Sequence, residues 1–110
     1  MLVAKKLEIS DLYDAYSSLL SEEQSAALDF YYNEDLSLAE IAEQTGISRQ
    51  GVRDRIKHGE TFLLFYEEKL HLCEKYQKTE DILSQLEKNA DNISKEELCK
   101  YISELRLINE

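Results

Sequence analysis

The stretch that decides the fold is Ser-Leu-Ala-Glu-Ile-Ala-Glu-Gln-Thr-Gly-Ile-Ser-Arg-Gln-Gly-Val-Arg-Asp-Arg-Ile, residues 37–56. Ser37 and Glu40 have the spacing of a capping box, in which the two residues satisfy each other's free backbone N–H groups at the start of a helix. Gly46 can adopt the left-handed backbone angles that end a helix, and Ser48 can cap the next one directly. The pattern predicts a helix-turn-helix over residues 38–57.

The apolar residues of this stretch support the same interpretation. Ala42 is small where two helices would cross closely, and Ile41 and Ile47 would fill the space between them. Val52 and Ile56 lie four residues apart and would anchor the second helix to the core. Each feature is common alone, but together they are specific for this motif.

Helical periodicity continues on both sides of the motif. A first helix is expected to end near Leu20, and a second, opened by Ser21 and Gln24 as another capping box, should bury Ala27, Leu28 and Tyr31 before it stops at residues 33–35. After the motif, the pattern predicts one long helix from residue 49 to about residue 76. Gly51 and Gly59 weaken this helix, which makes Gly59 a candidate position for a bend or break.

Two further helices are expected in the C-terminal third of the chain. Thr79 should cap the first of them, and Ser94 with Glu97 forms a third capping box that should open the second. We therefore divide the chain into a helix-turn-helix domain, residues 1–76, and a C-terminal helical hairpin, residues 77–110. Whether this extension packs on its own chain or mediates dimerisation stays open.

The composition agrees with an all-α fold. The 110 residues include no proline and three glycines, and they are 43% hydrophobic and 33% charged. No apolar run approaches the roughly 20 residues that span a bilayer, so we expect a cytoplasmic protein without membrane insertion.

Positive charge is concentrated in the second helix of the motif. The chain has 13 basic and 23 acidic residues and a net charge of −10, which opposes binding to phosphates. Residues 48–58 nevertheless carry four basic side chains against Asp54, a local charge of +3 that leaves −13 for the other 99 residues.

Six residues of this helix are candidates for binding nucleic acid. We expect Arg49, Gln50 and Arg53 to face base edges, since arginine pairs bidentately with guanine and glutamine with adenine. We expect Ser48, Arg55 and Lys57 to hold the phosphate backbone. The alternative is that the motif only packs a helical core or contacts a protein.

The sequence does not favour an enzyme. Its two histidines, His58 and His71, lie apart from any Ser, Cys or carboxylate cluster with catalytic or metal-binding spacing, and no glycine-rich phosphate loop occurs. Cys73 and Cys99 belong to no paired motif, so reduced thiols are expected. We expect no metal site and no cofactor.

The chain resembles a known family over roughly residues 10–76. The segments that carry the resemblance are Leu-Leu-Ser-Glu-Glu-Gln (19–24), Phe-Tyr-Tyr-Asn-Glu-Asp-Leu-Ser-Leu-Ala-Glu-Ile-Ala-Glu (30–43), Ser-Arg-Gln-Gly-Val-Arg-Asp-Arg-Ile-Lys (48–57) and Tyr-Glu-Glu-Lys-Leu (66–70). They look like the YlxM-like helix-turn-helix proteins of Gram-positive bacteria. The motif is also similar to the promoter-recognising fourth region of bacterial sigma factors.

This resemblance implies a regulatory protein of the signal recognition particle pathway, or an accessory that binds the particle's protein or its RNA. One departure is Gly51, where the family pattern leads us to expect alanine. Helix-turn-helix proteins usually bind DNA as dimers, so a homo-oligomer is expected. The rival hypothesis is a protein-binding module whose acidic helices after His58 attract a basic partner. Their acidic residues are Glu60, Glu67, Glu68, Glu74, Glu80, Asp81 and Glu87.

Overall fold

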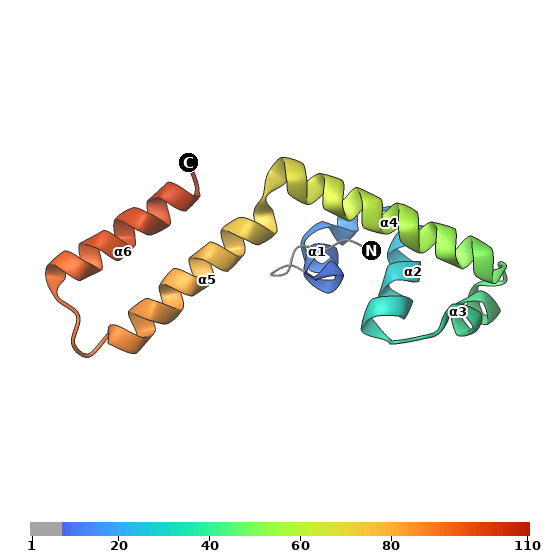
Figure 1. The fold of residues 1–110 in the computed structure, drawn as a ribbon, viewed down its shortest axis with the longest axis horizontal. Helices are drawn as coiled ribbons and strands as arrows, with labels where there is room; N and C mark the ends of the chain where they lie inside the picture. The colour runs from blue at the N-terminus through green and yellow to red at the C-terminus, as the bar shows by residue number, and fades with distance from the viewer. Residues whose placement is uncertain (1–7) are drawn as a thin grey trace. The chain divides into compact units, whose positions relative to one another are not determined.

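The computed structural model describes residues 8–110 of the chain, and all regular structure within them is helical (Figure 1). The chain divides into two compact units, Met1–His71 and Leu72–Glu110. The α-helices are α1 (Ile9–Tyr16), α2 (Glu22–Leu28), α3 (Leu38–Thr45), α4 (Arg49–Leu70), α5 (Leu72–Asn89) and α6 (Lys95–Ile108). The all-α prediction is confirmed.

In the first unit, α1, α2 and α3 lie against one side of α4 (Figure 1). Helix α4 turns Val52, Ile56, Gly59 and Leu63 to these helices at steps of four, three and four residues, which keeps them on one face. The other helices contribute the apolar side chains that complete the core, namely Ile9, Leu12, Tyr16, Ala27, Leu28 and Ile41. Leu7, which helical periodicity assigns to the apolar face of the first helix, lies outside the described residues.

Serine caps begin α2, α3, α4 and α6, as the sequence predicts. The hydroxyl oxygens of Ser21 and Ser37 accept hydrogen bonds from the backbone N–H groups of Gln24 and Glu40, and both capping boxes are complete. Ser94 likewise caps α6, but there the Glu97 carboxylate accepts from the Ser94 hydroxyl. Local hydrogen bonding therefore determines where these helices start.

The prediction of one helix from residue 49 to about residue 76 is wrong. Helix α4 ends at Leu70, and His71 takes the left-handed conformation with φ 56° while its N–H donates to the Glu67 carbonyl. The break therefore lies at His71, and α4 runs through Gly59. Thr79 does not cap a helix either, because it lies inside α5 and its hydroxyl donates to the Lys75 carbonyl.

The expected burial of Tyr31 is also wrong. A π-helical turn, Asp29–Asn33, follows α2, and Tyr31 within it remains 38% exposed. Successive residues of a π-turn rotate by a smaller angle than those of an α-helix, so Tyr31 does not fall on the face set by Ala27 and Leu28. The Tyr31 ring instead packs edge-on against Tyr32.

The second unit is a hairpin of α5 and α6. The two helices run antiparallel and contact each other (Figure 1). Four of their apolar side chains are half-buried, namely Ile82, Leu86, Leu105 and Ile108. No residue of α6 is fully buried. Several large apolar or aromatic side chains of the hairpin remain exposed, among them Tyr76, Leu83, Leu98 and Ile102.

Within residues 8–110, no helix is both long enough and apolar enough to cross a membrane.

Candidate nucleic-acid interface

The turn between α3 and α4 holds the two helices of the motif together. Gly46 has φ 75°, and its N–H donates to the Ala42 carbonyl at 2.9 Å, which closes α3. Ser48 then caps α4 by accepting a hydrogen bond from the Gly51 N–H at 3.0 Å. Ile41 and Val52 are fully buried beneath the turn. The helix-turn-helix predicted over residues 38–57 is therefore present.

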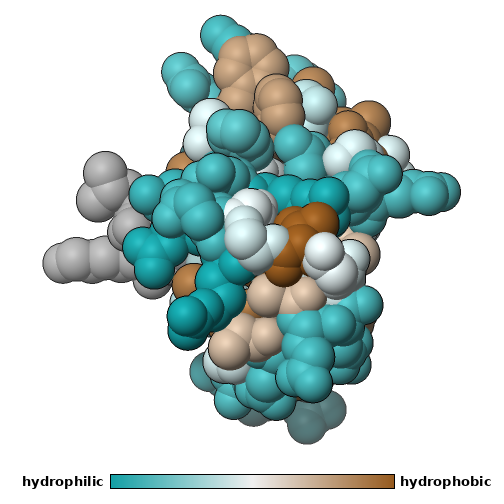
Figure 2. All heavy atoms as spheres, turned by 90° about the vertical axis from the view of Figure 1, so that its right-hand side faces the viewer, coloured by the Kyte–Doolittle hydropathy of each residue, from teal (hydrophilic) through white to brown (hydrophobic). Residues whose placement is uncertain are grey.

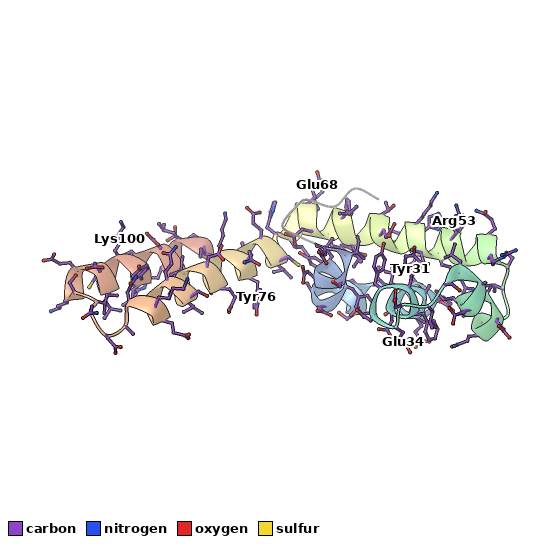
Figure 3. All side chains as sticks on the ribbon, turned by 60° about the horizontal axis from the view of Figure 1, so that its bottom comes forward. Tyr31, Glu34, Arg53, Glu68, Tyr76 and Lys100 are labelled. Carbon is purple, nitrogen blue, oxygen red and sulfur yellow. The ribbon has the colours of Figure 1, made fainter. Side chains whose placement is uncertain are left out.

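Four of the six predicted site residues share one exposed side of α4. Arg49, Gln50, Arg53 and Lys57 are all exposed, and at about 100° of rotation per residue they lie within roughly 100° of one another around the helix. Figure 3 shows the Arg53 side chain projecting away from α4. We call Arg49, Gln50, Arg53 and Lys57 the basic side of α4.

The other two predicted residues have different surroundings. Ser48 is exposed at the N-terminus of α4, where its hydroxyl is engaged as the helix cap. Arg55 is half-buried and lies about 200° around the helix from Arg53. Arg55 is therefore not brought together with the residues of the basic side.

A shallow groove joins the basic side to the start of α3. It is lined by Arg49, Gln50 and Arg53 from α4 and by Ser37, Leu38 and Ala39 from α3. Figure 2, viewed toward the end of the first unit that carries α3, shows a mostly hydrophilic face around a small hydrophobic area. The N-terminus of a helix has free backbone N–H groups and a partial positive charge, both of which favour an anion beside two arginines.

Two carboxylates moderate this positive surface. The Asp54 carboxylate accepts a hydrogen bond from the Gln50 side-chain amide at 3.0 Å, one turn along α4. In α3, hydrogen bonds from the Ser37 backbone N–H and then from its hydroxyl lower the pKa of Glu40, so this carboxylate is ionised near neutral pH. The groove therefore combines donors from two arginines with two nearby negative charges.

The contribution of residues 37–39 was missed by our sequence analysis. The signal in the sequence was the Ser37–Glu40 capping box, because it marks the start of a helix and every helix start has free backbone N–H groups. Their position beside Arg49 and Arg53 depends on the angle at which α3 and α4 meet, which the sequence pattern does not give.

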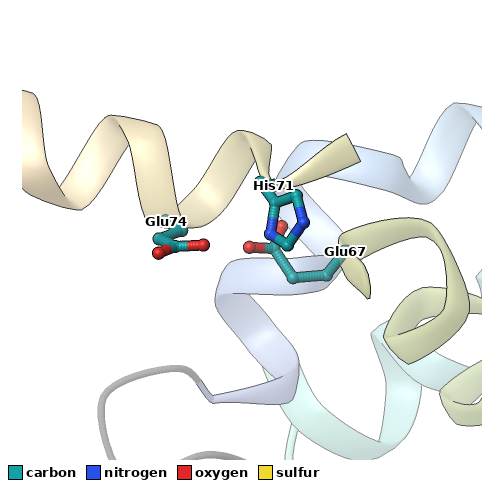
Figure 4. A group of neighbouring side chains, drawn as sticks. All are labelled: Glu67, His71 and Glu74. Atoms are coloured by element: carbon teal, nitrogen blue, oxygen red, sulfur yellow. The ribbon is translucent and has the colours of Figure 1, made fainter. Parts of the chain in front are cut away.

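Two other carboxylates of α4 are engaged inside the first unit. Glu67 is 8% exposed and accepts a hydrogen bond from the buried Tyr16 hydroxyl at 2.6 Å. One of its oxygens and a ring nitrogen of His71 lie within 4.8 Å of each other (Figure 4). Glu60 accepts a hydrogen bond from the Tyr32 hydroxyl. Burial is the main cause that raises the pKa of the Tyr32 phenol, and this hydrogen bond is the second. Both carboxylates serve the packing of α4.

Comparison with known proteins identifies the family. Residues 3–104 match the family described as "Putative helix-turn-helix protein, YlxM / p13 like". The chain belongs to this family. The YlxM/p13-like description names a helix-turn-helix protein and no enzymatic activity, in agreement with the motif formed by α3 and α4.

Several YlxM/p13-like relatives are similar over most of their length. A protein of Halalkalibacterium halodurans is 44% identical over 102 residues, which cover 92% of this chain and 94% of the relative. One from Clostridium perfringens is 46% identical over 103 residues, covering 90% of each chain. One from Listeria monocytogenes serotype 4b is 50% identical over 76 residues, or 69% of each. These relatives come from Gram-positive bacteria, as the sequence resemblance implied.

Proposed function

We propose that this protein is a DNA-binding regulatory protein that inserts the N-terminal half of α4 into the major groove of duplex DNA. The observation that carries the proposal is the exposed basic side of α4 next to the N-terminus of α3. In helix-turn-helix proteins the second helix of the motif contacts base edges while the first crosses the phosphate backbone. Here those helices are α4 and α3.

The chemistry of the basic side suits both kinds of contact. Arg49 and Arg53 can pair bidentately with guanine, and Gln50 can pair with adenine once it leaves Asp54. Asp54 itself can accept a hydrogen bond from the amino group of cytosine. Lys57 and the N–H groups at the start of α3 supply phosphate contacts. Ser48 remains a candidate for a backbone contact at the edge of this surface, whereas Arg55 lies on another side of α4 and is not part of it.

The overall charge of −10 favours a dimeric arrangement in this proposal. Two copies would present two basic sides to two half-sites about one helical turn apart, which doubles the phosphate contacts of one protein particle. We assign the contact between copies to the hairpin of α5 and α6, because its apolar side chains Leu83, Leu98 and Ile102 are exposed.

Binding to duplex DNA at several salt concentrations tests the proposal. Arg49→Ala combined with Arg53→Ala should weaken binding by about 1–3 kcal/mol for each lost base contact. Lys57→Ala removes a phosphate contact and should lower the slope of log affinity against log salt by about one, since each phosphate contact releases roughly 0.9 counterions when it forms. Lys88→Ala with Lys100→Ala removes the same charge as the arginine variant from exposed positions of α5 and α6 and should leave binding and the slope unchanged. Unchanged binding by the arginine variant, or no binding by the wild type at low salt, would contradict the proposal.

A second candidate function is an accessory of the signal recognition particle that binds no DNA. It is favoured by exposed carboxylates on the end of α4 and on α5, which could attract a basic protein surface; they are Glu68, Glu74, Glu80, Asp81 and Glu87. A pull-down with the purified particle protein, with and without its RNA, separates the candidates. Retention by the protein alone supports the accessory function, whereas retention only with RNA supports nucleic-acid recognition.

A further inference from the structure

Helix α4 carries a second exposed surface on the side away from its basic side. His58, Phe62, Phe65 and Lys69 follow one another at steps of four, three and four residues, and we call them the aromatic seam. Phe62 is 43% exposed and Phe65 is 49% exposed. Phe62 follows Arg53 by nine residues, and at about 100° per residue the two side chains lie about 180° apart around α4. The seam is therefore separate from the surface assigned to DNA.

The spacing of the seam is that of a helix-packing surface. Steps of four and three residues keep side chains in one straight line along a helix and let them fit between the side chains of a second helix. The buried face of α4, which includes Val52, Ile56 and Leu63, already packs on the rest of the first unit. A second line of large apolar side chains on the same helix indicates a second helical neighbour.

Each aromatic ring of the seam already has a neighbour on α4, which competes with stacking on a nucleobase. Phe62 stacks on Tyr66, with ring centroids 6.3 Å apart and an angle of 21° between the planes. The Lys69 ammonium lies 5.7 Å from the centre of the Phe65 ring. Base recognition by aromatic side chains uses an open ring face, so these contacts favour a protein as the occupant.

Charge restricts which protein helix fits. The seam contains the cation of Lys69 and no acidic residue, and its N-terminal end is flanked by the half-buried Arg55 on one side and the exposed Asp54 on the other. Packing two copies of the seam together in parallel would bring Lys69 against Lys69. A helix with carboxylates beside its apolar line would instead pair with Lys69 and Arg55.

We propose that the aromatic seam of α4 is a docking site for an amphipathic, acid-flanked helix of another protein. The partner helix would lay apolar side chains against Phe62 and Phe65 and place its carboxylates near Lys69 and Arg55. Because the seam lies opposite the basic side, this contact is independent of DNA binding. One molecule could hold both partners at once.

Two synthetic peptides of three heptads test the proposal with the full-length protein. Both carry leucine at the a and d positions, and one has glutamate and the other lysine at e and g, so that like charges keep each peptide from pairing with itself. Fluorescence anisotropy should show that the glutamate peptide binds about tenfold more tightly than the lysine peptide. Equal binding of the two peptides, or no binding of the glutamate peptide, would overturn the proposal.

Variants locate the binding surface. Phe62→Gln with Phe65→Gln should weaken binding of the glutamate peptide by about tenfold or more, because both side chains would lie at the centre of the contact. Thr61→Ala with Glu68→Gln changes exposed positions of the same helix outside the seam and should bind as the wild type does. Circular dichroism checks that both variants keep their helices.

The same variants show whether a second copy of this chain or a nucleic acid binds the seam instead of a partner helix. If the phenylalanine variant lowers the mass measured by sedimentation, the seam joins two copies of this chain and the proposal is wrong. If it weakens binding to an oligouridine strand and leaves the glutamate peptide unaffected, the seam binds nucleic acid and the proposal is equally wrong.

Discussion

Gly59 lies where α4 packs closely against Leu28 of α2. A Cβ atom added there would lie 2.7 Å from the Leu28 Cδ1 atom, and Leu28 is fully buried, so it has little room to move. We predict that Gly59→Ala lowers the free energy of unfolding by about 1–3 kcal/mol, despite the better helix propensity of alanine. Urea denaturation measures this. Thr61→Ala, at an exposed position of the same helix, should be close to neutral, and equal stability of the Gly59 variant would show that the helices can separate without cost.

The hydrogen bond between Tyr16 and Glu67 is a second contact whose removal should be costly. Both residues are buried, and the Tyr16 hydroxyl donates to the carboxylate at 2.6 Å. Tyr16→Phe deletes this donor and leaves a buried acceptor less well satisfied, so we predict a loss of about 1–3 kcal/mol in the free energy of unfolding. Tyr13→Phe is a suitable comparison, because the Tyr13 hydroxyl pairs with Ser25 in a half-buried position. Equal losses in the two variants would contradict the importance of burial at Tyr16.

The cap of α3 gives a prediction that depends on pH. Ser37 lowers the pKa of Glu40 below its ordinary value of 4.5, mainly through its backbone N–H and secondly through its hydroxyl. A lowered pKa in the folded state stabilises the fold above pH 4.5, and that contribution is lost as the pH falls through the folded-state pKa. Ser37→Ala keeps the N–H and removes the hydroxyl, so the pKa of Glu40 should rise part of the way toward 4.5.

Carboxyl carbon NMR titration follows Glu40 directly. Ser94→Ala, which removes the equivalent cap of α6, serves as the control and should leave the titration of Glu40 unchanged. An unchanged pKa of Glu40 in the Ser37 variant would mean that the hydroxyl does not contribute.

Helix starts were easier to predict than helix ends. The caps at Ser21, Ser37 and Ser94 use residues within three positions of one another, so the sequence contains all that they need. The end of α4 has no glycine to mark it, because His71 adopts a conformation that glycine usually provides. Likewise, nothing in the local pattern around Tyr31 distinguishes a π-turn from an α-helical turn. Both errors arose where the backbone departs from what the side chains locally favour.

The candidate site shows the same limit. The exposure of Arg49, Gln50, Arg53 and Lys57 on one side of α4 follows from helical periodicity once Val52 and Ile56 are assigned to the core. Periodicity also separates Arg55 from Arg53, a consequence that our sequence analysis did not draw. The groove with residues 37–39 required the packing of α3 against α4, which is a property of the tertiary fold.

Considered as a whole, the chain leaves its second unit without a core of its own. The 39 residues of Leu72–Glu110 form two helices, and chains below about 40 residues rarely fold stably without a partner, a metal or a disulfide. Each helix of the hairpin has one side that faces the other helix. Measured around the helix axis from that side, residues 76 and 83 of α5 are rotated in the same direction as residues 98 and 102 of α6. In an antiparallel pair, this rotation places all four on the same side of the hairpin. Their exposed side chains, Tyr76, Leu83, Leu98 and Ile102, therefore share one face of the hairpin.

Pairing of this face between two copies would bury it in a four-helix arrangement, the commonest way for two amphipathic helical hairpins to hide their apolar sides. We predict that the melting temperature rises with protein concentration, as mass action requires for a dimer, and that sedimentation gives twice the chain mass. Leu98→Glu with Ile102→Glu should abolish both effects. Ser84→Glu with Ser103→Glu adds the same charge at exposed positions of α5 and α6 and should abolish neither. If the wild type sediments as a monomer at every concentration, each particle has a single basic side of α4. DNA binding as a dimer would then be excluded.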